Sequence, residues 1–248
     1  TRSLDVARTT AAAGARPRAR SDMAPRTNRR LTPRAAPDGY TLLVHHIGMA
    51  TSPALYRKLT FNVPEDFEFL GLINEAPSIV IGKSSLEANN FEELRKYITT
   101  NGSKVNLANA GLGSASHLCG LMLQSALKTA MTPVPYKGTA PAMTDLLGGQ
   151  IDLMCEQSGN AVPQVTGKKV KAYGVTGPQR LQIAGLKDLP TLTEAGLKDF
   201  NVQIWHGLYA PRNTPPAVLA KLNAALRTAL KDPDFIKKQE GLGAMVVT

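Results

Sequence analysis

The chain has 248 residues and a mass of 26.5 kDa, with 43% hydrophobic and 19% charged residues. These values suit one large globular domain or two small ones, and they exclude a fibrous repeat or a chain disordered throughout. The longest uncharged run, 105–127, is rich in Asn, Gly and Ser, which excludes a membrane-spanning helix there. The formal net charge of +10 raises the question of a nucleic-acid partner.

The positive charge is concentrated at the N-terminus. Residues 1–36 hold nine Arg and two Asp, whereas residues 37–248 hold 20 basic and 17 acidic side chains. The few large apolar residues of 1–36 keep neither a helical nor a strand period. A transit peptide, a nucleic-acid-binding arm and a segment foreign to the fold all fit this composition. We expect a non-native or disordered Arg-rich segment, arising from a cloning scar or from translation in the wrong reading frame.

From residue 37 onward, short apolar runs alternate with helical segments, which is the pattern of an α/β fold. We expect strands at 41–45, 69–73, 78–81, 105–107, 134–136, 151–155, 170–175 and 205–210. We expect helices at 53–59, 90–100, 117–128, 141–147 and 217–230, another beginning at 232–233, and a short one after the capping box of Thr191 and Glu194. On the 117–128 helix, Leu118, Leu121 and Met122 share one face with Ser125.

These elements form two expected lobes, each a sheet flanked by helices. Lobe 1 comprises 37–102 plus 209–248 and lacks part of its sheet, and lobe 2 comprises 103–208. Two chain crossings between lobes form a hinge, and a ligand cleft is expected between the lobes at the carboxyl ends of strands.

The richest stretch for binding is the turn NAGLGSASHL at 109–118. Gly111 and Gly113 let a ligand approach the backbone, Ser114 and Ser116 offer hydroxyls, and a helix N-terminus follows. The turn fits a carboxylate or phosphate seat, or equally a structural turn with Ser caps. It lacks the third glycine of a dinucleotide fingerprint.

A second candidate seat is the strand-to-helix turn at 136–141. Lys137 adds a positive charge there, and Thr139 serves either as a ligand contact or as a helix cap. Each turn supports the prediction of a binding site at the other, because parallel strands place both turns at one sheet edge.

Side chains for catalysis or metal binding are sparse. Ser114 and His117 have no acid positioned by a motif, and the four histidines lack metal-ligand spacing. Cys119 and Cys155 are expected to be buried, inert thiols rather than nucleophiles, and their number leaves the redox compartment open. We therefore expect no enzyme activity and no cofactor.

Six motifs together resemble one family, the receptors of tripartite tricarboxylate transporters, also called Bug or TctC-like proteins. They are PDGYTLL at 37–43, GLGSASHL at 111–118, PYKGTAPA at 135–142, GQIDLM at 149–154, PTLTEAG at 190–196 and WHGL at 205–208. The resemblance implies a periplasmic, two-lobed receptor with the type II periplasmic-binding-protein architecture. It also implies a monomer that closes over a small organic carboxylate and hands it to membrane permease subunits.

The resemblance also implies site residues. One ligand carboxylate is held in the family by the Gly-x-Gly-Ser turn, here Gly111, Gly113, Ser114 and Ser116. Positions that set specificity at the other end of the ligand correspond here to His46, Gly48, Met49, Glu156 and Gln157. Glu156 suits a ligand amine better than a second carboxylate. The family's leading strand and loop, which form part of the anion site, have no counterpart in 1–36, and no signal peptide is evident.

A second function remains open, a nucleic-acid-associated protein that uses the Arg-rich arm. Salt dependence separates the two, because an arm that neutralises several phosphates loses affinity steeply as salt rises. The nearly neutral remainder of the chain favours the receptor, and no nucleic-acid partner is expected.

Overall fold

The computed structural model describes residues 18–20, 34–59 and 61–247, with the backbone alone for 18–20. The chain divides into two compact units, both of α/β type, as predicted. Of the described residues, unit 1 comprises 18–20, 34–59, 61–74, 205–238 and 246–247, and unit 2 comprises 75–204 and 239–245. The first boundary falls after residue 74 rather than 102, because the helix at 91–101 packs on a strand of unit 2.

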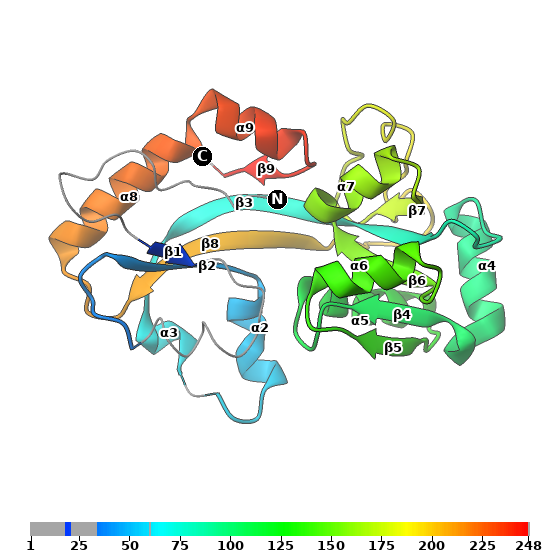
Figure 1. Cartoon of the computed structure of the whole chain (residues 1–248), viewed down its shortest axis with the longest axis horizontal. Helices are drawn as coiled ribbons and strands as arrows, with labels where there is room; N and C mark the ends of the chain where they lie inside the picture. The colour runs from blue at the N-terminus through cyan, green and yellow to red at the C-terminus, as the bar shows by residue number, and fades with distance from the viewer. Residues whose placement is uncertain (1–17, 21–33, 60, 248) are drawn as a thin grey trace. The chain divides into compact units, whose positions relative to one another are not determined.

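Unit 1 is built on a short mixed sheet (Figure 1). Strand β2 (Thr41–His46) pairs antiparallel with β8 (Gln203–Pro211), and β8 neighbours the first part of β3 (Phe67–Lys83). The helices that begin in this unit are α2 (Gly48–Leu55), α3 (Val63–Asp66), α8 (Pro216–Leu230) and α9 (Pro233–Glu240), and the short strand β9 (Met245–Val246) pairs with β3.

Successive side chains of β2 point to opposite faces of this sheet, and both faces are buried. Leu42 packs in a cluster with Leu226 and Leu230 of α8, whereas Leu43 packs on the opposite face with Met49 and Phe67. Period-two alternation places successive side chains on opposite faces, so a six-residue strand serves two small cores.

Strand β1 (Arg18–Arg20) lies inside the segment predicted to be foreign to the fold, and it pairs parallel with β2 through Thr41–Leu43. Strand pairing uses backbone groups, so it needs no apolar pattern in the side chains. The rest of the prediction for 1–36, including the arm of the alternative function, concerns residues 1–17 and 21–33, which lie outside the described residues.

Unit 2 contains a parallel core of three strands. Strand β4 (Asn106–Asn109) lies between β5 (Thr132–Pro135) and β6 (Leu153–Gln157) and is parallel to both. The second part of β3 pairs antiparallel with β6 and with β7 (Val170–Val175). The helices are α4 (Phe91–Asn101), α5 (Ala115–Leu127), α6 (Thr139–Leu147) and α7 (Ser158–Thr166), with a 3-10 turn at Gly102–Lys104.

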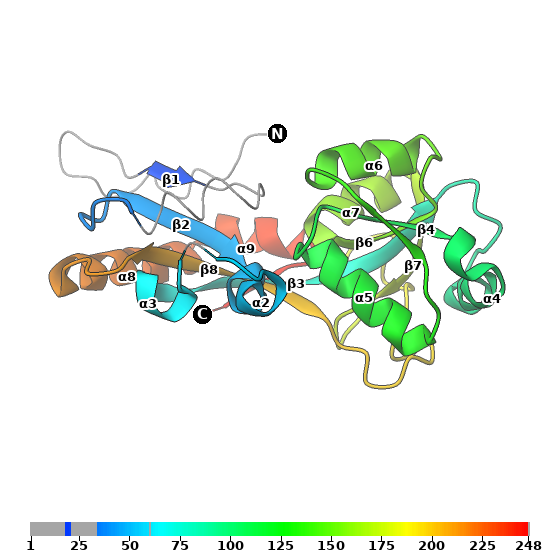
Figure 2. The same cartoon turned by 90° about the horizontal axis from the view of Figure 1, so that it is seen from below.

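Helices cover both faces of these strands (Figure 2). Helices α6 and α7 cover one face, where Leu146 and Val162 join Met154 of β6 in one apolar cluster. Helix α5 covers the other face, where Gly120 approaches Leu107 so closely that a Cβ atom there would lie 2.9 Å from its Cδ2. Along β6, Met154 and Glu156 therefore face α6 and α7, and Cys155 faces α5.

The two cysteines correct the prediction of free thiols. Cys119 of α5 and Cys155 of β6 form a disulfide across the interface between helix and strand, with their Cα atoms 6.0 Å apart. Their sequence separation of 36 gave no signal, because the pairing depends on how α5 lies on the sheet. A disulfide is typical of an oxidising compartment.

The face of helix α5 that packs on the sheet is not the face that carries the predicted apolar stripe. Leu121 and Met122 are exposed, and the buried residues of the helix are Ser116, Cys119, Gly120, Leu123 and Leu127. The face that packs on the sheet therefore combines small residues and the disulfide with Leu123 and Leu127.

Several further elements differ from their predictions. The strands predicted at 69–73 and 78–81 are one strand, β3, in which Pro77 precedes Ser78, the first residue in register with β6. Helix α2 begins at Gly48, and Pro53, predicted as its start, lies inside it. Helix α7 was not predicted, and it contains Gly159 and Pro163, residues that are unfavourable inside a helix.

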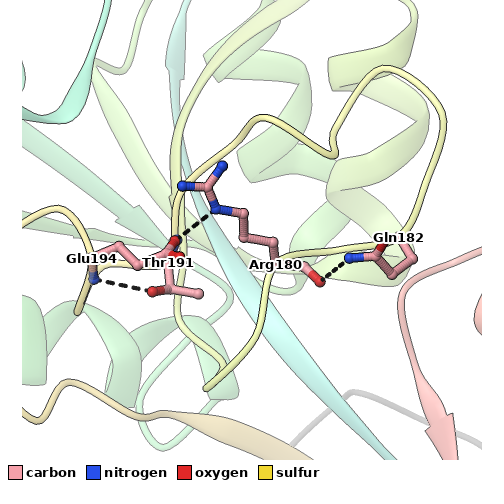
Figure 3. Close-up of polar contacts among 4 residues, drawn as sticks. All are labelled: Arg180, Gln182, Thr191 and Glu194. Atoms are coloured by element: carbon pink, nitrogen blue, oxygen red, sulfur yellow. Dashed lines mark hydrogen bonds and ion pairs between the residues drawn. The ribbon is translucent and has the colours of Figure 1, made fainter.

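The capping box at Thr191 and Glu194 forms without the predicted helix. The Thr191 N–H donates to the Glu194 carboxylate at 2.8 Å. The Glu194 N–H donates to the Thr191 hydroxyl at 3.1 Å (Figure 3). Arg180 holds the same carboxylate at 2.8 Å, and the chain continues in turns. The box therefore closes a loop in this protein.

Within the described part of the chain, no helix is long and apolar enough to cross a membrane.

Candidate functional site

Three helix N-termini meet one edge of the unit 2 sheet. Strands β4, β5 and β6 run parallel, and each is followed within a few residues by α5, α6 or α7. The carboxyl ends of parallel strands lie at the same edge, so both predicted seats are there, as expected. The unpredicted helix α7 adds a third N-terminus, next to Gln157.

The Gly-rich turn after β4 is built for close backbone approach. Gly111 and Gly113 have φ angles of 110° and 76°, in the region that favours glycine. A Cβ atom at Gly111 would also lie 3.1 Å from the carbonyl oxygen of Tyr136. The turn after β4 therefore lies directly against the turn after β5, and the two predicted seats are neighbours.

Both hydroxyls of this turn take part in local hydrogen bonds. Ser114 caps α5, since its Oγ accepts from the His117 N–H at 3.2 Å, and it lies 3.1 Å from the Ser116 Oγ. The Ser116 Oγ also accepts from the Ala110 N–H at 2.9 Å. The prediction of Ser caps is thus correct for Ser114, and the hydroxyls are held in place beside the first N–H groups of α5, which have no acceptor inside the helix.

His117 does not activate Ser114. Its Nδ1 accepts from the Gly113 N–H at 3.3 Å, and burial lowers the pKa of the imidazole. Nucleophilic catalysis requires a base within reach of the nucleophile hydroxyl. The hydrogen bond to Gly113 uses this imidazole to hold the turn instead.

The second seat differs from its predicted form. Lys137 is exposed, and the N-cap of α6 is Gly138 rather than Thr139, without a side-chain cap. The buried Thr139 hydroxyl lies 3.4 Å and 3.5 Å from the two carboxylate oxygens of Glu156. The Thr139 hydroxyl therefore contacts the Glu156 carboxylate instead of capping the helix, and this contact exists only in the folded unit.

Glu156 is a buried acid at the end of β6. Its side chain is 3% exposed, and its carboxylate accepts from Asn160 Nδ2 at 2.8 Å and from the Gln157 backbone N–H. Burial raises the pKa of Glu156 to about 7, against the opposite effect of the hydrogen bonds from Asn160, Gln157 and Thr139. Unlike a surface glutamate, Glu156 changes its charge near neutral pH.

The other three predicted site residues lie in unit 1. The Gly48 N–H donates to His46 Nδ1 at 3.0 Å, and the His46 ring packs against those of His45 and His206 at centroid distances of 4.5 Å and 6.4 Å. Met49 is 1% exposed and belongs to the apolar core with Leu43. The Met49 side chain therefore packs in the core of unit 1.

His206, in the WHGL motif, is a polar residue that was not among the predicted site residues. Its Nδ1 lies 2.7 Å from Asn74 Oδ1, and burial lowers the pKa of its imidazole to about 4. Asn74 and His206 are 132 residues apart, so only the pairing of strands brings them together.

His206 makes stability depend on pH. Its pKa when folded is below 6.5, so the unfolded chain binds the proton first, and stability present above about pH 6.5 is lost as the pH falls toward 4. From pH 7 to pH 5, wild type should lose roughly 2 kcal/mol more of its free energy of unfolding than His206→Gln. Urea unfolding at both pH values measures this difference, and equal losses would contradict it.

Other features of the described residues carry no comparable chemistry. A hollow of about 560 Å³ along α4 is lined by Asn90, Glu92, Glu93, Arg95, Lys96 and Thr99. These are the side chains of an exposed helix face, and they do not converge on one point as the three N-termini do. Within the described ranges, no group of three His, Cys, Asp or Glu side chains could hold a metal ion.

Comparison with known proteins gives consistent matches. Residues 27–247 match the family model described as the tripartite tricarboxylate transporter family receptor. The UPF0065 protein in the TAR-I ttuE-ttuC' intergenic region of Agrobacterium vitis is 47% identical over 214 residues, which are 86% of this chain and 61% of that protein. The chain spans about three fifths of the length of the curated relatives it matches.

Two solved structures are similar over most of the chain. That of the periplasmic binding protein BugD has 46% identity and a TM-score of 0.84, over 88% of this chain and 73% of that one. MatC from Rhodopseudomonas palustris, solved with bound malate, has 39% identity and a TM-score of 0.81, over 88% of this chain and 74% of that one.

Proposed function

Because the chain belongs to the family of tripartite tricarboxylate transporter receptors, we propose that it captures a small organic carboxylate and delivers it to the membrane subunits of such a transporter. The family is one of receptors rather than of enzymes, in agreement with the sequence analysis. One observation supports the ligand class above others. The Gly-rich turn holds two hydroxyls beside the N-terminus of a 13-residue helix, an arrangement that suits an anion.

The proposed site is the sheet edge of unit 2. The turn residues Gly111, Gly113, Ser114 and Ser116 contact the carboxylate, and Thr139, Glu156 and Gln157 belong to the same edge. A relative with 39% identity was solved with malate, a dicarboxylate, which supports this ligand class. For unit 1, a role of His46 and Gly48 in ligand contact stays a prediction, and we leave out Met49 because its side chain lies in the core.

We propose that the protein works in the periplasm. The similarity to the periplasmic binding protein BugD supports this location, and so does the disulfide between Cys119 and Cys155, because disulfides persist in oxidising compartments.

Ser114 provides the test of the carboxylate site. Ser114→Ala removes one hydroxyl donor, so it should weaken binding of malate, or of whichever carboxylate binds from a panel of mono- and dicarboxylates, by roughly 1–2 kcal/mol. This corresponds to a 5- to 30-fold rise in Kd, measured by titration calorimetry.

The matched control is Ser125→Ala, which removes an exposed hydroxyl from the same helix. Ser114 also caps α5, so urea unfolding must show that the variant is still folded at the titration temperature. An unchanged Kd in folded Ser114→Ala, or a panel in which no carboxylate binds, would refute the proposal.

A further inference from the structure

Glu156 is a buried acid without a basic partner in the described part of the chain. None of the three ion pairs there includes it, and the groups that donate to its carboxylate are all neutral. A buried carboxylate without a cation is costly to keep ionised, and neutral donors offset only part of that cost. The charge of Glu156 is therefore sensitive to any further charge that arrives nearby.

The proposed carboxylate seat is close to this acid. Strands β4 and β6 are neighbours, with Ala108 opposite Met154, so Glu156 is level with Ala110, the residue before Gly111. Neighbouring strands lie about 4.8 Å apart. Thr139, which contacts the Glu156 carboxylate, follows the turn that lies against Gly111, so a carboxylate on the N–H groups after Gly111 is on the order of 10 Å from the Glu156 carboxylate.

We propose that capture of a carboxylate by the Gly-rich turn is coupled to the uptake of a proton by Glu156. The proton comes from the buffer and binds a carboxylate oxygen of Glu156, and no bond of the ligand is made or broken. This inference rests on the proposed function. It adds that the negative charge of the ligand is offset by neutralising the negative charge of Glu156.

Electrostatics sets the size of the effect. The pKa of Glu156 is about 7 before any ligand arrives, so close to half of the molecules carry the proton at neutral pH. A second negative charge at about 10 Å, at an effective dielectric constant near 20, favours the protonated form roughly tenfold. Binding at pH 7 should therefore take up about 0.4 proton per ligand.

Few other titratable groups face Glu156. Strand β4, helix α7 and the residues of β3 paired with β6 carry none. Helix α6 carries Asp145, which binds the Tyr136 hydroxyl at 2.6 Å, the turn before α6 carries Lys137, and α5 carries His117. None of them contacts the Glu156 carboxylate. His117 is in the Gly-rich turn itself, where its Nδ1 accepts from the Gly113 N–H and burial lowers its pKa, which favours the neutral imidazole at pH 7. Glu156 is therefore the group expected to take up the proton.

Calorimetry can count the proton. Malate is titrated at pH 7 into wild type in two buffers with different ionisation enthalpies, and the difference in heat gives the protons taken up per ligand. We expect about 0.3–0.5 for wild type and close to zero for Glu156→Gln. The control Glu87→Gln, an exposed acid of the same unit, should match wild type.

A second measurement needs no variant. The infrared difference spectrum of wild type with and without malate should gain the stretching band of a protonated carboxyl group. Ligand binding without proton uptake, uptake that persists in Glu156→Gln, or a spectrum without this band would overturn the inference and leave the proposed function standing. Failure of every carboxylate in the panel to bind would instead refute the proposed function, and this inference with it.

Discussion

Reducing the disulfide between Cys119 and Cys155 should lower the free energy of unfolding by about 2–4 kcal/mol, because the open chain gains entropy in the unfolded state. The closed loop spans 36 positions and joins α5 to β6, so its loss affects the helix that carries the Gly-rich turn. Urea unfolding followed by circular dichroism, with and without dithiothreitol, measures the change.

The double variant Cys119→Ala/Cys155→Ala is the control for this prediction. It should be less stable than the oxidised wild type, and its unfolding curve should not respond to dithiothreitol. Equal stability of wild type with and without dithiothreitol would show that the disulfide contributes nothing.

Replacing Asp152 by Ala should cost about 2–4 kcal/mol of stability. Asp152 is 7% exposed, and its carboxylate binds Lys83 Nζ at 2.7 Å and accepts from the Asn106 N–H at 2.8 Å. The variant leaves a partly buried ammonium and a backbone N–H without their acceptor, which costs more than an ion pair on the surface contributes. Urea unfolding of both proteins gives the difference.

Two variants separate these contributions. Asp152→Asn keeps an acceptor for the Asn106 N–H and loses the charge, so its loss should be smaller than that of Asp152→Ala. Arg180→Ala breaks the pair with Glu194, in which both side chains are more than 40% exposed, and it should leave stability close to that of wild type. A loss for Arg180→Ala as large as for Asp152→Ala would contradict the argument.

The candidate site was predictable only in part. The turn at 109–118 could be recognised because its glycines, hydroxyls and helix start are adjacent in sequence, and Ser114 caps α5 as such a pattern predicts. The contact of Thr139 with Glu156 could not be recognised, because these residues come from different elements 17 positions apart. Residue type alone suggested a cap at Thr139, a role that Gly138 has in the structure.

The sequence by itself determined the family, the α/β class and most of the helices and strands, since periodicity, caps and motifs are local patterns that neighbouring residues carry. Only the tertiary structure decided that Cys119 meets Cys155, that α5 packs through the face with Gly120 and Leu123, and that β3 runs unbroken past Pro77. It also decided that Glu156 is buried beside Thr139 and Asn160. The physical reason is that burial and partner choice depend on how whole elements stack, and the free energy of that stacking comes from contacts between residues far apart in the chain.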